Sequence, residues 1–319
     1  MKKSFVWKNI GLVGWKHRDA QCFTTEFGIK LRRFVSPAIR SIIGLAATKP
    51  YRVVRYPKLD KTKPYIFAAG HSFPGEVEPY VASIDRNAWL LVGTTDQIDH
   101  NPKMYMAWLN GMVYVNRLSA ASRKDATRKM ERILLRGSSV IMFPEGALNN
   151  SENTYCSPLY PGVYHLAIST GASVVPIVAQ SERGEKEIRI AASEPISFSG
   201  MEKEQALDIL RDTLSTLRYE LCSDYPPLKR SEMQGDIHFR HLQTRRNIYM
   251  EVKWIEPNWD EEIVMRRKQG VAFPQDVFGV IDNVRVTKDN AWIIAPILLQ
   301  NELFRKYDIV RFMKEHWKK

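Results

Sequence analysis

Short apolar runs alternate with amphipathic stretches between residues 65 and 222, and this alternation restricts the fold more than any other feature of the chain. The apolar runs read as buried strands over residues 65–70, 88–93, 112–116, 138–143, 173–179 and 187–192. Residues 119–137 and 202–222 each carry one apolar stripe at helical spacing, and Ser122 and Asp125 predict a capping-box start for the first. We therefore predict an α/β fold with a mostly parallel central sheet flanked by helices.

A further amphipathic helix is predicted before this region, over residues 24–45. Its apolar positions recur at spacings of three and four and are Phe27, Leu31, Phe34, Val35, Ala38 and Ile42. Basic residues lie between them. Two interpretations stay open: the helix lies in a membrane interface, or it packs on the core and leaves a basic face in solvent.

The charge of the chain favours anionic partners. It has 47 Lys and Arg against 35 Asp and Glu, a formal net charge of +12. Nucleic acid, an anionic membrane and a phosphate-bearing substrate all fit this excess, but no nucleic-acid recognition motif is present. Cys22, Cys156 and Cys222 are widely scattered, which is typical of reduced thiols inside a cell. No apolar run approaches about 18 residues, so no transmembrane helix is expected.

A histidine follows the first predicted strand, and a carboxylate follows the histidine. The stretch reads Gly70-His71-Ser72-Phe73-Pro74-Gly75-Glu76. A histidine held by a carboxylate commonly takes a proton from a hydroxyl or an amine. Glu76 is favoured as the partner by its spacing, and Glu78 is a competing one.

Three other stretches follow in a particular order along the chain. They are residues 111–117, which end in Asn116-Arg117, the block Phe143-Pro144-Glu145-Gly146, and residues 174–177, which contain Pro176. With His71 and Glu76, these stretches resemble the four sequence blocks of the glycerolipid acyltransferase family, typified by bacterial lysophosphatidate acyltransferases. The resemblance covers about residues 55–200, and the Phe-Pro-Glu-Gly block after a strand is its most specific part.

The resemblance implies an enzyme that moves a fatty acyl group from a thioester donor to a lysophospholipid-like acceptor, most simply 1-acylglycerol-3-phosphate. His71 would be the general base for the acceptor hydroxyl or amine, and Glu76 would orient it. The substrate-binding residues implied are Asn116, Arg117, Phe143, Pro144, Glu145, Gly146 and Pro176. Arg117 would pair with a phosphate. The donor is acyl-CoA or acyl carrier protein, and neither a cofactor nor a metal is expected.

The chain departs from the family pattern at several positions. Glu76 and Asn116 each replace an aspartate, and Ala147-Leu148-Asn149 replaces the usual Thr-Arg after the glycine. Leu159-Tyr160-Pro161-Gly162 stands where lysines are expected. Cations that would hold a glycerol phosphate are therefore missing from these positions. The acceptor stays open among lysophosphatidate, a less phosphorylated lysolipid, an amino-acid lipid with a free hydroxyl or amine, and another alcohol.

The changes of pattern along the chain also predict how it is divided. We predict an N-terminal membrane-docking segment over residues 1–50, a catalytic domain over 51–228 and a C-terminal extension of unknown role over 229–319. The protein would lie peripherally on the cytoplasmic side of a membrane, without a nucleic-acid partner.

Three alternative functions remain open. Gly70, Ser72 and Gly75 superficially resemble a serine hydrolase elbow, although the second glycine comes one residue late. A metal site from His71, Glu76, Glu78 and His100 lacks a short-spaced ligand pair. A non-catalytic lipid-binding member of the same fold is the third.

Overall fold

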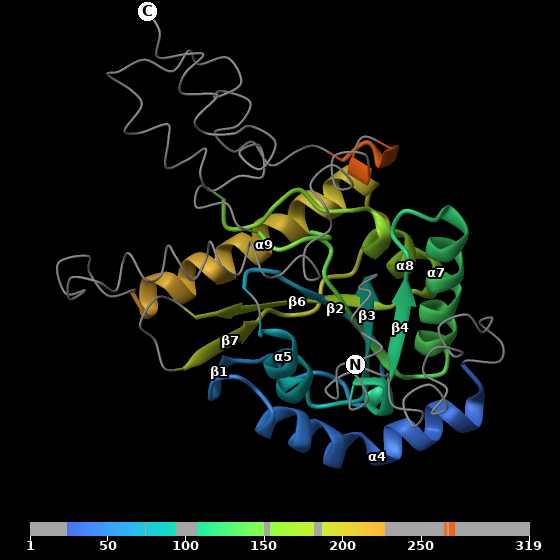
Figure 1. Ribbon diagram of the computed structural model, residues 1–319. Coiled ribbons are helices and arrows are strands. Elements are labelled where there is room, and N and C mark those ends of the chain that lie inside the picture. Colours follow the sequence, from blue (N-terminus) through green and yellow to red (C-terminus); the bar gives the residue numbers. More distant parts are fainter. Residues whose placement is uncertain are drawn as a thin grey trace, which may run out of the picture.

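The protein folds around one seven-stranded sheet with the strand order β1-β7-β6-β2-β5-β3-β4 (Figure 1). The computed structural model describes residues 24–73, 75–93, 107–149, 154–181, 187–226, 265–266 and 268–271. The strands are β1 (Tyr51–Arg55), β2 (Tyr65–Ala69), β3 (Ala88–Gly93), β4 (Met112–Val115), β5 (Ser139–Met142), β6 (Ser173–Gln180) and β7 (Ile188–Ala192).

The pairing of the strands confirms the predicted mostly parallel α/β sheet. Strands β4, β3, β5, β2 and β6 are mutually parallel, whereas β7 runs antiparallel to β6 and pairs with β1 in parallel. The six predicted strands correspond to β2 through β7. Strand β1 was not predicted, because it lies at the sheet edge and exposes much of its Tyr-Arg-Val-Val-Arg sequence.

The helices connect the strands and cover both faces of the sheet. They are α4 (Glu26–Leu45), α5 (Val77–Ser83), α7 (Ala120–Leu135), α8 (Gly162–Thr170) and α9 (Lys203–Asp224). Three of them confirm predicted helices, whereas α5 and α8 were not predicted because they have only 7 and 9 residues. The predicted capping box is wrong: Ser119 caps α7, and its hydroxyl accepts a hydrogen bond from the backbone N–H of Ser122.

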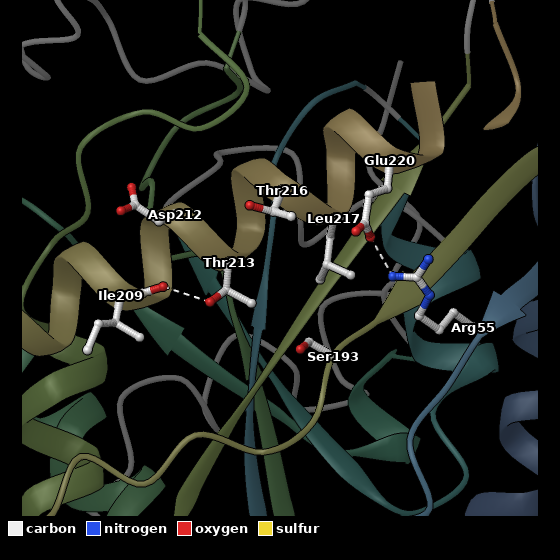
Figure 2. Close-up of a pocket in the computed structure, with 8 residues that line it drawn as sticks. All are labelled: Arg55, Ser193, Ile209, Asp212, Thr213, Thr216, Leu217 and Glu220. Carbon is white, nitrogen blue, oxygen red and sulfur yellow. Dashed lines mark hydrogen bonds and ion pairs between the residues drawn. The ribbon is translucent and has the colours of Figure 1, made fainter. Parts of the chain in front are cut away.

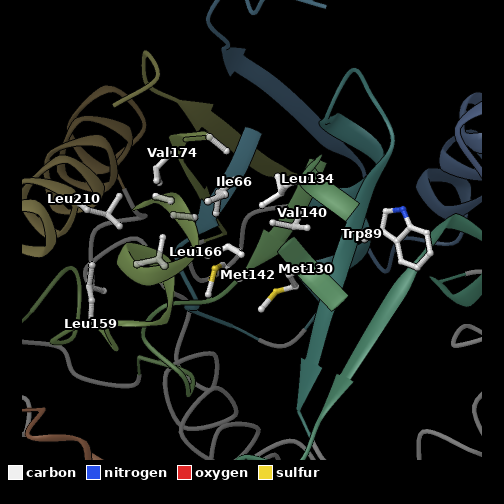
Figure 3. Close-up of a cluster of buried hydrophobic side chains, with 14 of the residues drawn as sticks. Ile66, Trp89, Met130, Leu134, Val140, Met142, Leu159, Leu166, Val174 and Leu210 are labelled. Carbon is white, nitrogen blue, oxygen red and sulfur yellow. The ribbon is translucent and has the colours of Figure 1, made fainter. Parts of the chain in front are cut away.

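The core has two parts because successive strand residues point to opposite faces of the sheet. In β2, Ile66 and Ala68 pack with α7, α8 and α9, while Phe67 and Ala69 pack on the face covered by α5. Figure 3 shows the first part, where side chains from the strands meet those of the helices. A strand buried on both faces is held firmly, and β2 is therefore a rigid support for the residues that follow it.

Helix α4 packs on the rest of the protein with the face opposite to its apolar stripe. Ile29, Ser36 and Ile43 are its buried residues, whereas Phe27 and Phe34 are 77% and 84% exposed. Two of its arginines are turned toward the protein. Arg32 lies over the rings of Trp89 and Trp108, and Arg40 donates to the carbonyl of Ile84. The helix thus packs on the core, as the second interpretation expected, but its apolar stripe faces outward, and the expectation of a wholly solvated basic face is wrong for Arg32 and Arg40.

None of the helices in the described ranges is long and apolar enough to cross a membrane. The predicted domain boundaries at residues 50 and 228 stay predictions. Most of the extension from residue 229 lies outside the described residues, as do Cys22, Pro74 and His100.

Candidate active site

His71 stands at the carboxyl end of β2, two residues beyond Ala69, the last residue of the strand. The intervening Gly70 donates its N–H to the carbonyl of Ile177 on β6, at 2.9 Å. Its own carbonyl accepts the hydroxyl of the buried Tyr80 at 2.8 Å. These two bonds tie the backbone before His71 to a neighbouring strand and to α5. Tyr80 was not identified from the sequence, because a tyrosine inside a short helix carries no distinguishing pattern.

Glu76 is the carboxylate that contacts His71. The distance from His71 Nδ1 to Glu76 Oε1 is 2.6 Å, and the two side chains are 19% and 0% exposed. The same carboxylate accepts the backbone N–H groups of Ser72 and Phe73. Gly75 allows the intervening turn, since its φ of +92° suits glycine and an added Cβ would lie 2.8 Å from Thr48 Oγ1.

This contact determines which imidazole nitrogen can accept a proton. An ionised carboxylate only accepts hydrogen bonds, so neutral His71 must carry its proton on Nδ1 and donate it to Glu76. Nε2 is then the unprotonated nitrogen and can act as a base. Within the part of the chain that the structure describes, no hydrogen bond involves Nε2.

Glu145 is buried beside the same loop, and each of its two carboxylate oxygens accepts a backbone hydrogen bond. Its Oε1 accepts the backbone N–H of His71 at 2.8 Å, and its Oε2 accepts that of Ser157 at 2.7 Å. Burial raises the pKa of Glu145, and the two backbone donors oppose that shift. A third hydrogen bond holds this loop, because the backbone N–H of Asn149 donates to the carbonyl of His71.

Phe143 packs against the imidazole. Its ring centroid lies 4.4 Å from that of His71 and 6.0 Å from that of Tyr80. Phe143 was predicted to lie in the substrate site, and it packs against the candidate catalytic histidine, where it limits rotation of the imidazole ring. Pro144 lies in the same turn, and its carbonyl accepts the N–H of Tyr160 at 2.8 Å.

Arg117 lies over an aromatic ring next to this turn. Its guanidinium carbon is 5.2 Å from the ring centroid of Tyr160. Gly146 makes room for both side chains: its φ is +77°, and an added Cβ would lie 2.5 Å from Tyr160 and 2.7 Å from Arg117. Asn116 forms a turn at the start of α7, where its Oδ1 accepts the N–H of Leu118.

Pro176 is buried inside β6 and pairs with Ala68 of β2. It therefore lies in the sheet that supports His71. The blocks around residues 71, 117 and 145 meet at the carboxyl ends of β2, β4 and β5, as their positions after parallel strands require.

Two of the alternative sites lack support in the described residues. There, no hydrogen bond joins Ser72 Oγ to His71, and no group of three or more His, Cys, Asp or Glu side chains is arranged to hold a metal ion. His100 itself lies outside them.

A separate cavity of about 400 Å³ lies along α9 (Figure 2). An ion pair between Arg55 and Glu220 stands at one end of it. Its lining residues are Arg55, Ser193, Ile209, Asp212, Thr213, Thr216, Leu217 and Glu220. None of these belongs to the four blocks, so we place the candidate chemistry at His71.

Comparisons with known proteins agree with this geometry. Residues 51–180 match the family model described as Acyltransferase. A 1-acyl-sn-glycerol-3-phosphate acyltransferase from Haemophilus influenzae is 24% identical over 111 residues, which are 32% of this chain and 45% of that protein's length. The chain therefore matches less than half of this relative.

The crystal structure of PlsC, the 1-acyl-sn-glycerophosphate (LPA) acyltransferase from Thermotoga maritima, shares the fold. Its TM-score is 0.50 at 18% sequence identity, and the match covers 63% of this chain and 84% of that chain. Both relatives are glycerolipid acyltransferases by name. Residues 51–180 of this chain therefore match the acyltransferase family model, and the chain shares the fold of a solved acyltransferase.

Proposed function

We propose that the protein transfers a fatty acyl group from a thioester donor to a hydroxyl or amine of a lysolipid acceptor, with His71 as general base. The observation that carries this proposal is the 2.6 Å contact between His71 Nδ1 and the buried carboxylate of Glu76, inside a segment that matches the acyltransferase family. A base positioned in this way accelerates proton transfer by roughly two to four powers of ten.

The chemistry needs no covalent enzyme intermediate. Nε2 of His71 takes the proton of the acceptor hydroxyl while the hydroxyl oxygen attacks the thioester carbonyl. The tetrahedral intermediate then collapses, the carbon–sulfur bond breaks, and the imidazolium returns the proton to the departing thiolate. Glu76 stabilises the imidazolium that exists between the two proton transfers.

The acceptor is most simply 1-acylglycerol-3-phosphate, because the name of one relative contains this compound and the name of the other contains 1-acyl-sn-glycerophosphate. Arg117 is the side chain proposed to pair with its phosphate, since a planar guanidinium fits phosphate oxygens. Acyl-CoA and acyl carrier protein are both anionic and both suit the net charge of +12.

Transfer of labelled acyl groups tests the proposal. Purified protein is incubated with acyl-CoA or acyl carrier protein and a panel of lysolipids, and the products are identified by mass spectrometry. His71→Ala is expected to abolish transfer, while Ser72→Ala keeps most of it. The reverse result would support a serine hydrolase. Lipid binding without transfer to any acceptor would support the non-catalytic alternative.

We further propose that the protein docks peripherally on the cytoplasmic side of a membrane through α4. The exposed apolar residues of α4 support this: they are Phe27, Leu31, Phe34, Ile42 and Leu45. Burying one phenylalanine in lipid is worth roughly 1.5–3 kcal/mol, so serine at both Phe27 and Phe34 should weaken vesicle binding at least a hundredfold.

Vesicles that contain anionic phospholipid provide the measurement. Leu135, which is 71% exposed at the end of α7, offers a matched control. Leu135→Ser should leave vesicle binding unchanged. Equal binding by the wild-type protein and the double serine variant would contradict docking through α4.

A further inference from the structure

A short segment from the C-terminal extension lies against the active-site loops. The described residues 265–266 and 268–271 come after the matched region 51–180, and Val271 donates its N–H to the carbonyl of Arg266. Figure 1 shows this segment in orange, on the side toward which the β3 and β4 arrows point. No role for this extension was predicted from the sequence.

Arg266 is a buried cation that joins two loops of the site. It is 2% exposed. Its Nη2 donates to the carbonyl of Glu145 at 3.0 Å, and its Nη1 donates to the carbonyl of Pro158 at 3.2 Å. A guanidinium is buried without a large penalty only where its N–H groups find acceptors, and here the acceptors come from the Glu145 turn and the Pro158 loop.

The same guanidinium also packs on Tyr160. Its central carbon lies 5.3 Å from the ring centroid, and that of Arg117 lies 5.2 Å from the same centroid. Tyr160 is therefore a shared platform for one arginine of the matched domain and one from outside it. The ring has little freedom, since its backbone N–H is bound to the carbonyl of Pro144.

The neighbouring Met265 contacts Arg123, which holds the backbone of Arg117. Met265 is 2% exposed, and its sulfur lies 3.9 Å from Nη1 of Arg123. That same nitrogen donates to the backbone carbonyl of Arg117. The segment thus contacts both Tyr160, on which the Arg117 side chain packs, and Arg123, which binds the backbone carbonyl of Arg117.

We propose that Arg266 is a positioning residue of this acyltransferase site. It holds the Glu145 turn and the Tyr160 loop together, and through Tyr160 it places the Arg117 guanidinium where the anionic group of the acceptor binds. The part of this inference that concerns the acceptor rests on the proposed function. The part that concerns the loops does not.

Kinetics test the first part. Arg266→Ala should lower kcat/KM roughly tenfold to a hundredfold, mainly through a higher KM for the acceptor, as expected for loss of charged hydrogen bonds. Since Arg266 acts through Arg117, the double variant Arg117→Ala/Arg266→Ala should be no worse than Arg117→Ala by more than about threefold. Losses that multiply would overturn the inference, as would an unchanged KM.

Two other variants keep the test interpretable. Lys268 is an exposed cation in the same segment, so Lys268→Ala removes one positive charge without the loop contacts and should match the wild-type protein. Arg266→Lys keeps the charge, but one ammonium cannot span both carbonyls in the geometry of a guanidinium fork. Arg266→Lys should therefore raise the KM for the acceptor as Arg266→Ala does, but by a smaller factor. It replaces the alanine variant in the test if that variant folds poorly.

Hydrogen exchange of the full-length protein tests the second part without any activity. In Arg266→Ala the backbone N–H groups of Ser157 and Tyr160 should exchange at least tenfold faster than in the wild-type protein and in Lys268→Ala. Unchanged exchange would refute the positioning role. If the wild-type protein acylates no acceptor, the proposed function fails, and exchange still decides whether Arg266 holds the loops.

Discussion

Replacement of Glu76 by glutamine is the sharpest test of the dyad. The change keeps the size of the side chain but removes its charge. In the native protein this fully buried carboxylate accepts the Nδ1–H of His71 at 2.6 Å and the N–H groups of Ser72 and Phe73. The amide of glutamine must turn an N–H toward one of these donors, so Glu76→Gln loses both an acceptor and the negative charge.

The expected loss in rate follows from electrostatics. Two unit charges about 4 Å apart interact by about 4 kcal/mol at the effective dielectric of a protein surface. Withdrawing that stabilisation from the imidazolium slows the reaction about a thousandfold. In the serine-protease triad, the equivalent loss of the carboxylate charge costs about ten-thousandfold in kcat. Glu76→Gln should therefore lower kcat by roughly three to four powers of ten.

The assay is acyl transfer under saturating donor, with the unfolding midpoint of each variant in urea as a fold control. Glu78→Gln is the matched control, because Glu78 is the competing carboxylate two residues on and should lose less than about threefold. A folded Glu76→Gln protein that keeps more than a tenth of the wild-type rate would refute the reasoning. Equal losses in the two variants would also refute it.

The other predictions concern the turn beside the dyad. Gly146→Ala should cost more stability in urea than Gly171→Ala, because both glycines have positive φ but an added Cβ meets Tyr160 and Arg117 only at Gly146. Equal losses of unfolding free energy in the two variants would show that the contacts of Gly146 with Tyr160 and Arg117 are not tight. Glu145→Gln should remove a pH dependence. Burial raises the pKa of Glu145 in the folded state. The stabilisation that protonated Glu145 contributes is therefore present below its unfolded pKa and is lost as pH rises through the folded value. The unfolding free energy of the wild-type protein, relative to Glu145→Gln, should fall as pH rises above the ordinary carboxyl range, and a constant difference would contradict this assignment.

Local patterns were enough to predict the strands that support the site. Strands β2 and β5 are continuous apolar runs, because both of their faces are covered by helices. The turn residues after them placed His71 and Glu145 at strand ends. The edge strand β1 escaped prediction, since a half-exposed edge lacks that apolar signal.

Other features depended on contacts between distant residues. The outward orientation of the α4 stripe reflects how Arg32, Ser36 and Ile43 fit the protein, and a helical periodicity alone cannot say which face is covered. The backbone bonds of the Glu145 carboxylate depend on residues 71 and 157, which are brought together only by folding.

The sequence by itself determined the α/β class and the family resemblance, together with the order of His71, Arg117 and Glu145 along the chain. These features follow from periodicity and short-range spacing, which a linear chain displays directly. Only the tertiary structure decided that Glu76 contacts His71, and that Arg266 reaches the turn where the sequence lacked a cation. Both depend on how loops pack on the sheet, because a hydrogen bond requires atoms within about 3 Å, and sequence spacing alone does not set that distance.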